Sequence, residues 1–500
     1  MCGIAAIVCP SPQTCPQQAH HESLVREALI RLRHRGPDDE GLNVLGTAIL
    51  GHRRLSVIDP AGGHQPLVAD DGAALIANGM IYNDLDLRRQ LADQSFTTHA
   101  DAESILHLLR RDGPDAVARL DGMFAFVLAL PDRVVAARDP LGIKPLYRFR
   151  LGGDVGFASE VKAFDGTADA VEEFPPGHVW DSVDGLRPFY AIPEPQSCDT
   201  PAADAVAELR ETLEAAVVKR LRSDVPFGCL LSGGLDSSLV CALARRHVEE
   251  LHTFAVGVEG SPDLAAARVV AQHLDTVHRE LVITPKDVSE AVPRVLQHLE
   301  SADVDLVRSA VGTYLVMGFA ARHVKVVLTG EGADELFAGY SYYADYDDPD
   351  LLQAELHRSL SGMHNVNLQR VDRMSMTHGV EARVPFLDTS VVEVAMRTPP
   401  ALKQGDPETG RRVAKWVLRA VAEDLLPAEV VWRRKEQFDE GSGLADLLPL
   451  LAGATSGEPD ADRVREAARY RALLSDGFQR PDLVLEIAGS WASDRLGADD

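Results

Sequence analysis

The chain has 500 residues, 45% of them hydrophobic and 25% charged, and this balance is typical of a soluble globular protein with two or three domains. Acidic residues outnumber basic ones by 76 to 50, and the net charge of −26 argues against binding to nucleic acid or to an anionic membrane. The six cysteines show no CxxC spacing, no apolar run is long enough to span a membrane, and the N-terminus lacks a signal-peptide pattern, which together predict a cytosolic protein with reduced thiols.

The chain begins with Met1, Cys2 and Gly3, so Cys2 becomes the first residue once Met1 is removed. A terminal cysteine carries both a thiol and a free amine, and an α-amine with a pKa of about 7.7 can accept the thiol proton near neutral pH. The alternative is a buried apolar residue at the start of a strand. Cys2 is therefore a candidate N-terminal nucleophile, and the rest of the chain decides between the two interpretations.

Short apolar segments separated by Gly, Pro, Asn and Asp fill the first part of the chain and predict strands joined by turns. The clearest predicted strands are 3–8, 73–77, 124–130 and 134–137, and helical spacing occurs at 22–34 and 101–111. Helices combined with sheets in this way predict an α+β layered domain over residues 2–192. The proline-rich segment 193–204 is the predicted linker.

After the linker, strong helical segments alternate with short β-branched runs. The predicted helices are 205–221, a helix from Asp236, and 264–274, and the predicted strands are 228–231, 251–258 and 324–328. Such alternation is the pattern of a parallel sheet wound with helices. We therefore expect an α/β domain over residues 205–500.

The strongest local motif lies between the predicted strand 228–231 and the helix that follows it. It consists of Leu231, Ser232, Gly233, Gly234, Leu235, Asp236, Ser237 and Ser238. The glycines let backbone N–H groups converge on an anion, the serines add donors, and Asp236 is a candidate Mg²⁺ ligand. No lysine follows a glycine, so this is not a Walker A motif. The alternative is a turn at which Ser237 caps the helix, but the combined residue types favour a phosphate-binding loop.

This loop resembles the pyrophosphate-binding loop of N-type ATP pyrophosphatases, which cleave ATP between the α- and β-phosphates. Together with the Met-Cys-Gly-Ile start, it makes the chain similar to glutamine-dependent asparagine synthetases of the bacterial type. The segments that support the resemblance are 34–38, 54–56, 78–79, 261–263, 330–335, 380–388 and 435–438. The resemblance implies an N-terminal nucleophile domain of αββα type, an ATP pyrophosphatase domain with many helices, and a homodimer.

The resemblance also implies roles in an N-terminal glutaminase site. Cys2 would attack the glutamine amide, and the side chain of Asn78 with the N–H of Gly79 would stabilise the developing oxyanion. Arg54 would bind the glutamine carboxylate and Asp101 its α-ammonium group. Taken singly, Arg54 could be a surface charge, Asn78 and Gly79 a hairpin turn, and Asp101 part of a helix start. The presence of Cys2 favours the functional interpretation.

One residue departs from the family at this site. The family usually reads Asn-Gly-Glu-Ile-Tyr-Asn, whereas residues 78–83 read Asn-Gly-Met-Ile-Tyr-Asn. Met80 thus removes a carboxylate near the expected glutamine amine, and Asp101 and backbone carbonyls remain as its candidate partners. We expect glutamine to be used nevertheless.

In the second domain the resemblance implies that an acceptor carboxylate attacks the α-phosphate of ATP and that ammonia, delivered through an internal tunnel, then displaces AMP from the acyl-adenylate. Glu331 would accept the proton from ammonia, and Lys435 would offset charge on the leaving group. The implied ATP- and pyrophosphate-binding residues are Leu231, Ser232, Gly233, Gly234, Asp236, Ser237, Ser238, Val256, Gly330, Arg308 and Lys435. The implied Mg²⁺ ligands are Asp236 and Asp334. Without the upstream loop, the Gly330–Gly332 segment would be read as a flexible turn.

A second departure concerns the acceptor. The family tends to read Asp-Val-Thr-Thr-Ile-Arg, whereas residues 303–308 read Asp-Val-Asp-Leu-Val-Arg. Asp305 and Leu306 therefore replace two hydroxyl groups by a carboxylate and an apolar side chain. Because like charges in a partly desolvated pocket repel, the sequence leaves the acceptor open between aspartate and another carboxylic acid, including one of secondary metabolism.

Three other classes of protein can carry parts of this pattern. A ring-closing ligase similar to β-lactam synthetases would generally lack the N-terminal cysteine, so Cys2 argues against it. A tRNA-modifying enzyme would need a basic surface, which the net charge of −26 opposes. A scaffold without activity would have no need of Cys2, Asn78, Asp236, Glu331 and Lys435. The predicted partners are therefore glutamine, ATP and a carboxylic acid, with no nucleic acid and no membrane.

Overall fold

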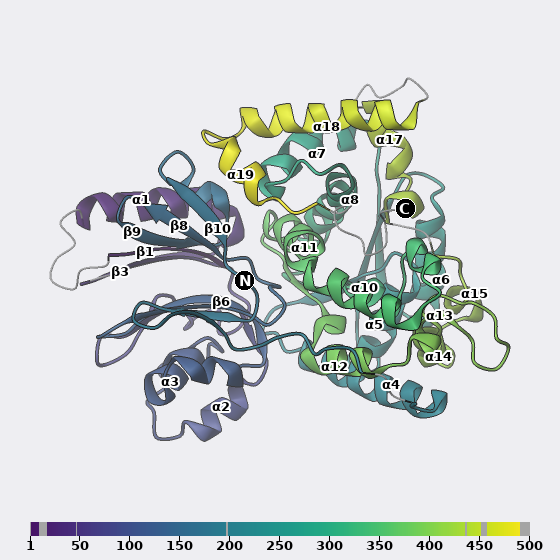
Figure 1. Cartoon of the computed structure of the whole chain (residues 1–500), viewed down its shortest axis with the longest axis horizontal. Helices are drawn as coiled ribbons and strands as arrows, with labels where there is room; N and C mark the ends of the chain where they lie inside the picture. Colours follow the sequence, from purple (N-terminus) through teal and green to yellow (C-terminus); the bar gives the residue numbers. More distant parts are fainter. Residues whose placement is uncertain are drawn as a thin grey trace.

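The computed structural model of the protein describes residues 2–9, 18–46, 48–196, 199–435, 438–451 and 458–490. Met1, whose removal is predicted, and Glu436 and Gln437 of the last motif lie outside the described residues, as do Ser197 and Cys198 of the predicted linker. In Figure 1 the purple and blue part of the chain forms stacked sheets on the left, and the teal to yellow part forms a helix-rich body on the right.

Two antiparallel sheets form the first domain. In spatial order, one contains β10 (Ala170–Glu173), β8 (Tyr147–Leu151), β9 (Asp154–Ala158), β1 (Cys2–Val8), β3 (Ala48–Arg54) and β2 (Asp39–Leu45). The other contains β12 (Gly185–Pro188), β11 (His178–Asp181), β7 (Val134–Arg138), β6 (Gly122–Ala129), β5 (Ala74–Ile81) and β4 (Leu67–Val68). The helices are α1 (Gln18–Arg31), α2 (Asp84–Gln90) and α3 (Glu103–Asp112), with short 3-10 turns η1 (Arg33–Arg35), η2 (Pro114–Arg119) and η3 (Val161–Phe164).

The order of layers explains why the central strands are apolar on both faces. On β1, Ile4 packs between the sheets with Ile76, whereas Ala5 faces outward into a cluster with Leu29 of α1. The other sheet is covered by α3 through a separate cluster that contains Ile105. A strand that is buried from both sides shows no polar alternation, as β1 demonstrates. The helix, sheet, sheet, helix order in Figure 1 confirms the predicted αββα layering.

A parallel sheet forms the centre of the second domain and confirms the predicted α/β class. Its strands are, in spatial order, β15 (Val277–Val282), β14 (His252–Gly257), β13 (Phe227–Leu230), β16 (Val326–Leu328) and β17 (Glu381–Arg383). The helices up to α11 are α4 (Ala202–Lys219), α5 (Leu235–Arg245), α6 (Pro262–Leu274), α7 (Pro285–Leu299), α8 (Val304–Ala320), α9 (Ala333–Phe337), α10 (Pro349–Ser361) and α11 (Asn367–Met376).

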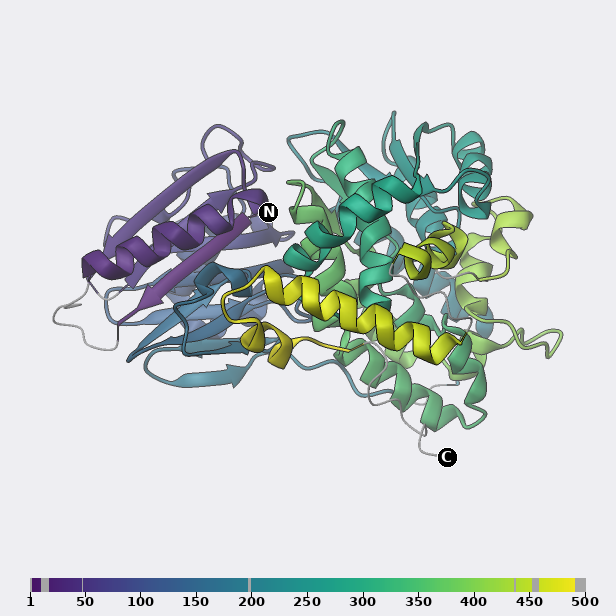
Figure 2. The same cartoon turned by 90° about the horizontal axis from the view of Figure 1, so that it is seen from above.

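The remaining helices continue to the C-terminal part of the chain. They are α12 (Thr389–Arg397), α13 (Pro400–Gln404), α14 (Trp416–Ala422), α15 (Ala428–Val431), α16 (Phe438–Gly441), α17 (Leu444–Leu451), α18 (Pro459–Asp476) and α19 (Pro481–Ile487). Short 3-10 turns are η4 (Ser341–Asp345), η5 (Met363–Asn365) and η6 (Pro385–Leu387). Helix α18 packs on α7 and α8, and α19 reaches back to β10 of the first domain (Figure 2).

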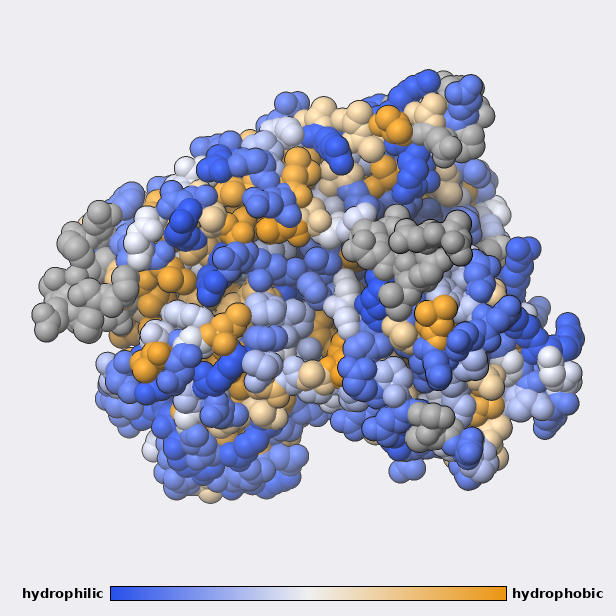
Figure 3. Space-filling view, viewed as in Figure 1, coloured by the Kyte–Doolittle hydropathy of each residue, from blue (hydrophilic) through white to orange (hydrophobic). Residues whose placement is uncertain are grey.

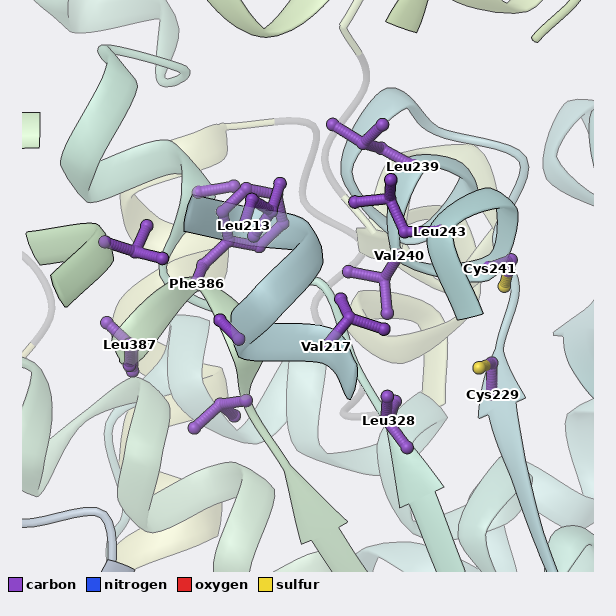
Figure 4. Packing of buried hydrophobic residues seen from close by; sticks show 14 of the residues in the cluster. Leu213, Val217, Cys229, Leu239, Val240, Cys241, Leu243, Leu328, Phe386 and Leu387 are labelled. Carbon is purple, nitrogen blue, oxygen red and sulfur yellow. The ribbon is translucent and has the colours of Figure 1, made fainter. Parts of the chain in front are cut away.

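Helix α5 is fixed to the parallel sheet by apolar packing. Figure 4 shows Leu239, Val240 and Leu243 of α5 beside Val217 of α4 and Leu328 of β16. All five side chains are buried. Because β13 and α5 are both held in this core, the loop that joins them has fixed ends.

A buried ion pair and buried hydrogen bonds join the two domains. The Arg35 guanidinium donates at 2.7 Å to Asp372 of α11. The Glu300 carboxylate accepts the backbone N–H groups of Val161 and Lys162 at 2.9 and 2.8 Å. Between the domains, β12 ends at Pro188 and α4 begins at Ala202, and the predicted boundary at 193–204 stays a prediction.

Hydrophilic residues cover most of the face shown in Figure 3, with hydrophobic residues in smaller groups between them. Among the described helices, none has the length and apolar character needed to cross a membrane.

Candidate active sites

The first candidate site surrounds Cys2, which is buried at the start of β1. The backbone nitrogen of Cys2 donates a hydrogen bond of 2.8 Å to Oδ1 of Asn78. Burial acts to raise the pKa of the Cys2 thiol, but the positive charges of the nearby His52 and of the chain's N-terminal amine, with a hydrogen bond from the backbone of Leu55, outweigh it and lower the pKa to about 6. A thiol of this kind is largely thiolate at neutral pH, which is the form that attacks carbonyl carbons.

Asn78 supplies an unused donor beside this thiol. Its side chain is fully buried on β5, and Nδ2 has no hydrogen-bond partner among the residues that the structure describes. A buried donor without a partner is costly, so its retention points to a ligand that accepts from it. At Gly79, an added Cβ would lie 2.2 Å from the carbonyl oxygen of Met123, so only glycine fits here.

The predicted glutamine-binding residues Arg54 and Asp101 are both buried in the same domain. The Arg54 guanidinium donates to the carbonyl oxygens of Ile58–Pro60 at 2.6 to 3.2 Å. These bonds use three of its five N–H groups and leave two for a ligand. The carboxylate of Asp101 accepts the N–H of Ile81 at 2.7 Å, and burial raises the pKa of Asp101 to about 6.

The structure places Met80 in an apolar environment. Its side chain is buried in a cluster with Leu55, Val57 and Met123. A thioether in such a cluster cannot replace the family's carboxylate as a partner for an ammonium group. Asp101 therefore stays the candidate partner of the glutamine amine.

The second candidate site is a cavity of about 390 Å³ at the carboxyl ends of β13, β14 and β16. In parallel sheets this edge is the usual place for a ligand. The predicted residues that line it are Leu231, Ser232, Gly234, Asp236, Ser237, Val256, Gly330, Glu331, Asp334 and Lys435. Gly233, Ser238 and Arg308 do not line it.

The loop between β13 and α5 has the geometry of an anion cradle. Gly233 has a φ of +74°, and a Cβ there would lie 2.5 Å from Ala266, so both its conformation and its neighbour require glycine. The Ser237 hydroxyl accepts the N–H of Ser232 at 3.2 Å. A Cβ on Gly330 would lie 2.8 Å from the backbone nitrogen of Ser237, so the Gly330 backbone closes directly against the loop.

Two carboxylates and two lysines meet next to this loop. The Lys415 ammonium lies 2.6 Å from Asp236 and 2.5 Å from Asp334, and Lys435 lies 2.8 Å from Asp334. Burial acts to raise the pKa of Asp334, but Lys415 and Lys435 outweigh it and hold the pKa well below its usual range. Burial acts to lower the pKa of Lys435, but Asp334 and Asp236 outweigh it and raise the pKa. Their mutual attraction therefore favours the charged forms of Asp334 and Lys435.

Sequence reasoning missed His52, Lys415 and Arg370. Arg370 forms an ion pair with Glu331 in the cavity, and burial raises the pKa of Glu331 even though Arg370 opposes the effect. Lys415 belongs to none of the motifs, because its position depends on a distant segment folding over Asp236. His52 lies two residues before Arg54 and stands opposite Ile4 in the pairing of β1 with β3, and only this pairing, which the sequence did not predict, brings it near Cys2.

Arg308 lies outside the cavity. Its guanidinium donates to the buried Glu466 of α18 at 3.1 and 2.6 Å, and Glu466 also accepts from the Tyr470 hydroxyl at 2.7 Å. The cavity is lined instead by other basic residues, which are Arg370, Lys415, Arg419, Arg433, Arg434 and Lys435. These residues are better placed than Arg308 to offset charge on a bound phosphate.

Comparison with known proteins gives a match for each half of the chain. The family model described as a glutamine amidotransferase domain matches residues 1–180, and the one described as asparagine synthase matches residues 208–349 and 344–491. A protein of Arabidopsis thaliana named glutamine-hydrolyzing asparagine synthetase 2 is 42% identical over 525 residues, which cover 98% of this chain and 89% of that protein. A glutamine-hydrolyzing asparagine synthetase of Asparagus officinalis is 40% identical over 492 residues, which cover 94% of this chain and 82% of that protein.

Among solved structures, a glutamine phosphoribosylpyrophosphate amidotransferase from B. subtilis complexed with ADP and GMP matches with a TM-score of 0.32 and 18% identity. The match covers 56% of this chain and 65% of that one. A likeness this weak adds nothing to the fold described above.

Proposed function

The chain belongs to the family of glutamine-hydrolysing asparagine synthetases, and on that premise we propose that it moves the amide nitrogen of glutamine onto the side-chain carboxylate of aspartate while ATP is cleaved to AMP and pyrophosphate. The observation that carries this proposal is the presence in one chain of an activated N-terminal thiol and a phosphate-binding cavity with a carboxylate of raised pKa.

Met1 is first removed, which makes Cys2 the N-terminal residue. In the glutaminase step, the amine of Cys2 then takes the thiol proton. The Cys2 sulfur attacks the amide carbon of glutamine, ammonia leaves with that proton, and water releases glutamate from the thioester. Nδ2 of Asn78 and the N–H of Gly79 stabilise the oxyanion, and a donor of this kind is worth about 3 kcal/mol of the barrier. The unused Asn78 donor supports this assignment.

Arg54 binds the α-carboxylate of glutamine, and Asp101 binds its α-ammonium group. The free N–H groups of Arg54 match a carboxylate, and the buried acid of Asp101 matches an ammonium group. Binding of that ammonium would lower the pKa of Asp101 from about 6, which would keep the ion pair formed at neutral pH.

In the synthetase step, ATP lies with its β- and γ-phosphates on the loop from Ser232 to Ser238. An oxygen of the aspartate side chain attacks the α-phosphorus, and the bond to pyrophosphate breaks. Lys435 and Lys415 offset the charge that moves onto pyrophosphate. Ammonia, passed through an internal tunnel, then attacks the acyl carbon, Glu331 accepts its proton, and AMP leaves. The raised pKa of Glu331 supports this role.

Asp236 and Asp334 are suited to hold Mg²⁺, because this ion prefers carboxylate and phosphate oxygens. Oδ1 of Asp236 is buried and has no hydrogen-bond partner among the described residues, so one ligand atom is ready. When bound, the ion would neutralise phosphate charge and orient the leaving group.

The decisive experiment incubates purified protein with glutamine, ATP, Mg²⁺ and aspartate and measures asparagine, glutamate, AMP and pyrophosphate. Equal amounts of all four products are expected. AMP formation without an amide product, or asparagine formed from ammonium but never from glutamine, would contradict the proposal. A parallel set of other carboxylic acids tests whether aspartate is the preferred acceptor, which the Asp305 and Leu306 replacements leave open in the sequence.

The division into a glutaminase domain (2–192), a linker (193–204) and a synthetase domain (205–500), the homodimer and the cytosolic location belong to the same proposal. The family matches at residues 1–180 and 208–491 support the division. Light scattering on the purified protein tests the dimer.

A further inference from the structure

Helix α8 contributes a polar stripe to the wall of the synthetase cavity. Asp305, Ser309 and Thr313 all line it and follow one another at a spacing of four residues. The Ser309 and Thr313 hydroxyls donate to backbone carbonyls one turn earlier in the helix, at 3.1 and 3.0 Å. Within this stripe, the carboxylate of Asp305 is therefore the charged group that faces a ligand.

The C-terminal helix α18 neutralises this carboxylate. The Arg463 guanidinium donates to both oxygens of Asp305, at 2.9 and 2.5 Å, across more than one hundred and fifty positions of sequence. The side chains of Arg463 and Asp305 are 43% and 32% exposed, so solvent reaches the pair. Helix α18 packs against α8, and Figure 1 shows it above α7 and α8.

A simpler explanation is that Asp305 only stabilises the start of α8. Asp303 already caps this helix through the N–H of Leu306 at 2.9 Å, and acids in a first turn interact favourably with the helix dipole. That explanation gives no reason for a dedicated arginine from another helix. An unpaired acid would oppose the binding of ATP and of an acidic acceptor, and the pairing with Arg463 removes this repulsion.

A carboxylate paired in this way can still bind a second cation. The two Arg463 contacts use two of about four lone-pair positions on the Asp305 oxygens. We propose that Asp305, held and neutralised by Arg463, binds the ammonium group of the amino-acid acceptor and so selects aspartate over diacids that lack an amine. This inference rests on the proposed synthetase function and names the residues of its acceptor site.

The test uses full-length protein with ammonium as the nitrogen source, which takes the glutaminase site out of the measurement. For the wild type, Asp305→Asn and Arg463→Met, we would measure kcat/KM for aspartate and inhibition by succinate, which is aspartate without its amine. Asp305→Asn should lower kcat/KM for aspartate roughly tenfold or more, because a charge-assisted hydrogen bond is lost. Succinate should inhibit this variant as well as or better than the wild type.

Arg463→Met leaves the Asp305 carboxylate uncompensated, so succinate should inhibit this variant about tenfold less well. Only Arg463→Met should therefore weaken succinate inhibition, whereas a purely structural role for the pair would weaken it in both variants. Arg465→Met is the matched control, because Arg465 lies on the same helix and pairs with Asp462 at 3.2 Å, and neither lines the cavity.

An unchanged kcat/KM for aspartate in Asp305→Asn would overturn the inference, and so would parallel losses in both variants together with a lower melting temperature. Failure of the proposed function looks different, since the wild type itself would then form no asparagine.

Discussion

The glutaminase site and the synthetase site differ in how they hold reactive groups inside the protein. Around Cys2 the partners are mainly hydrogen-bonding groups on neighbouring strands, and a single thiol carries the reaction. Around Asp236 and Asp334, two partly buried acids face two lysines in direct ion pairs. The difference follows from the substrates, because glutamine is neutral overall and ATP brings several negative charges that must be matched.

The two sites also differ in how far their residues lie apart in the chain. Cys2, His52 and Asn78 come from β1, β3 and β5 of one domain. In the second site, Lys415 reaches an acid that lies 179 positions away. Because the two sites share no residue, removal of one group from the first should leave the second working. In the second site each lysine contacts an acid that other groups also contact, so removal of one charge should weaken several ion pairs at once.

The largest expected effect comes from Cys2→Ala. Glutamine-driven synthesis should fall roughly a thousandfold or more, because the variant has no nucleophile. Ammonium-driven synthesis should be kept, since the ATP cavity does not contain Cys2. The rates of asparagine formation from glutamine and from ammonium measure the two activities. A simultaneous loss of both would mean that the sites are not separable.

A smaller loss is expected from Asn78→Ala, which removes the proposed oxyanion donor. The glutaminase kcat should fall about a hundredfold or more with a much smaller change in KM, because the donor acts mainly in the transition state. Asn83→Ala is the matched control, since Asn83 follows the same strand and donates to the carbonyl of Arg119 at 2.9 Å. Equal losses in the two variants would point to a general weakening of β5 instead.

Lys415→Met should affect the second site alone. Two partly buried acids would face one lysine, and we expect AMP formation from ATP, aspartate and ammonium to fall roughly tenfold to a hundredfold. Glutamine hydrolysis should stay at the wild-type rate. Lys286→Met is the control, because Lys286 is 81% exposed and does not line the cavity. Wild-type AMP formation in Lys415→Met would show that the ion pairs are not needed for ATP binding.

The two sites also explain how much the sequence could predict. Both fold classes follow from it, because the apolar strand 3–8 and the β13 loop are local patterns that the structure confirms as β1 and the β13 to α5 connection. The predicted strands were fewer than those observed. Strands such as β2 (Asp39–Leu45) and β15 (Val277–Val282) are only partly buried and carry charged residues, so they lack the apolar pattern on which the prediction relied.

Among the site residues, those within local motifs were predictable and those that act as partners were not. Lys415 lies in the left-handed region at a φ of +58°, ahead of a short helix, and nothing around it in the sequence indicates an active site. Arg463 is one of several arginines on α18, and only the folded chain shows that it faces Asp305. Arg308 shows the converse, since a motif position led to a predicted phosphate contact while the structure pairs it with Glu466.

The smallest expected effect is a shift in the pH dependence of Cys2 alkylation. With a pKa of about 6, the thiolate is fully present above that pH and is lost below it. The rate of inactivation by iodoacetamide should therefore rise about tenfold per pH unit up to about pH 6 and then level off, whereas an ordinary thiol continues to rise to about pH 8.5. Because His52 supplies the largest lowering effect, His52→Gln should move the inflection of the rate profile to higher pH.

Cys241 should not interfere, since burial raises the pKa of that thiol and it lies in the core. A rate that climbs steadily to pH 8 in the wild type would contradict the activation of Cys2, which would then be an ordinary buried thiol.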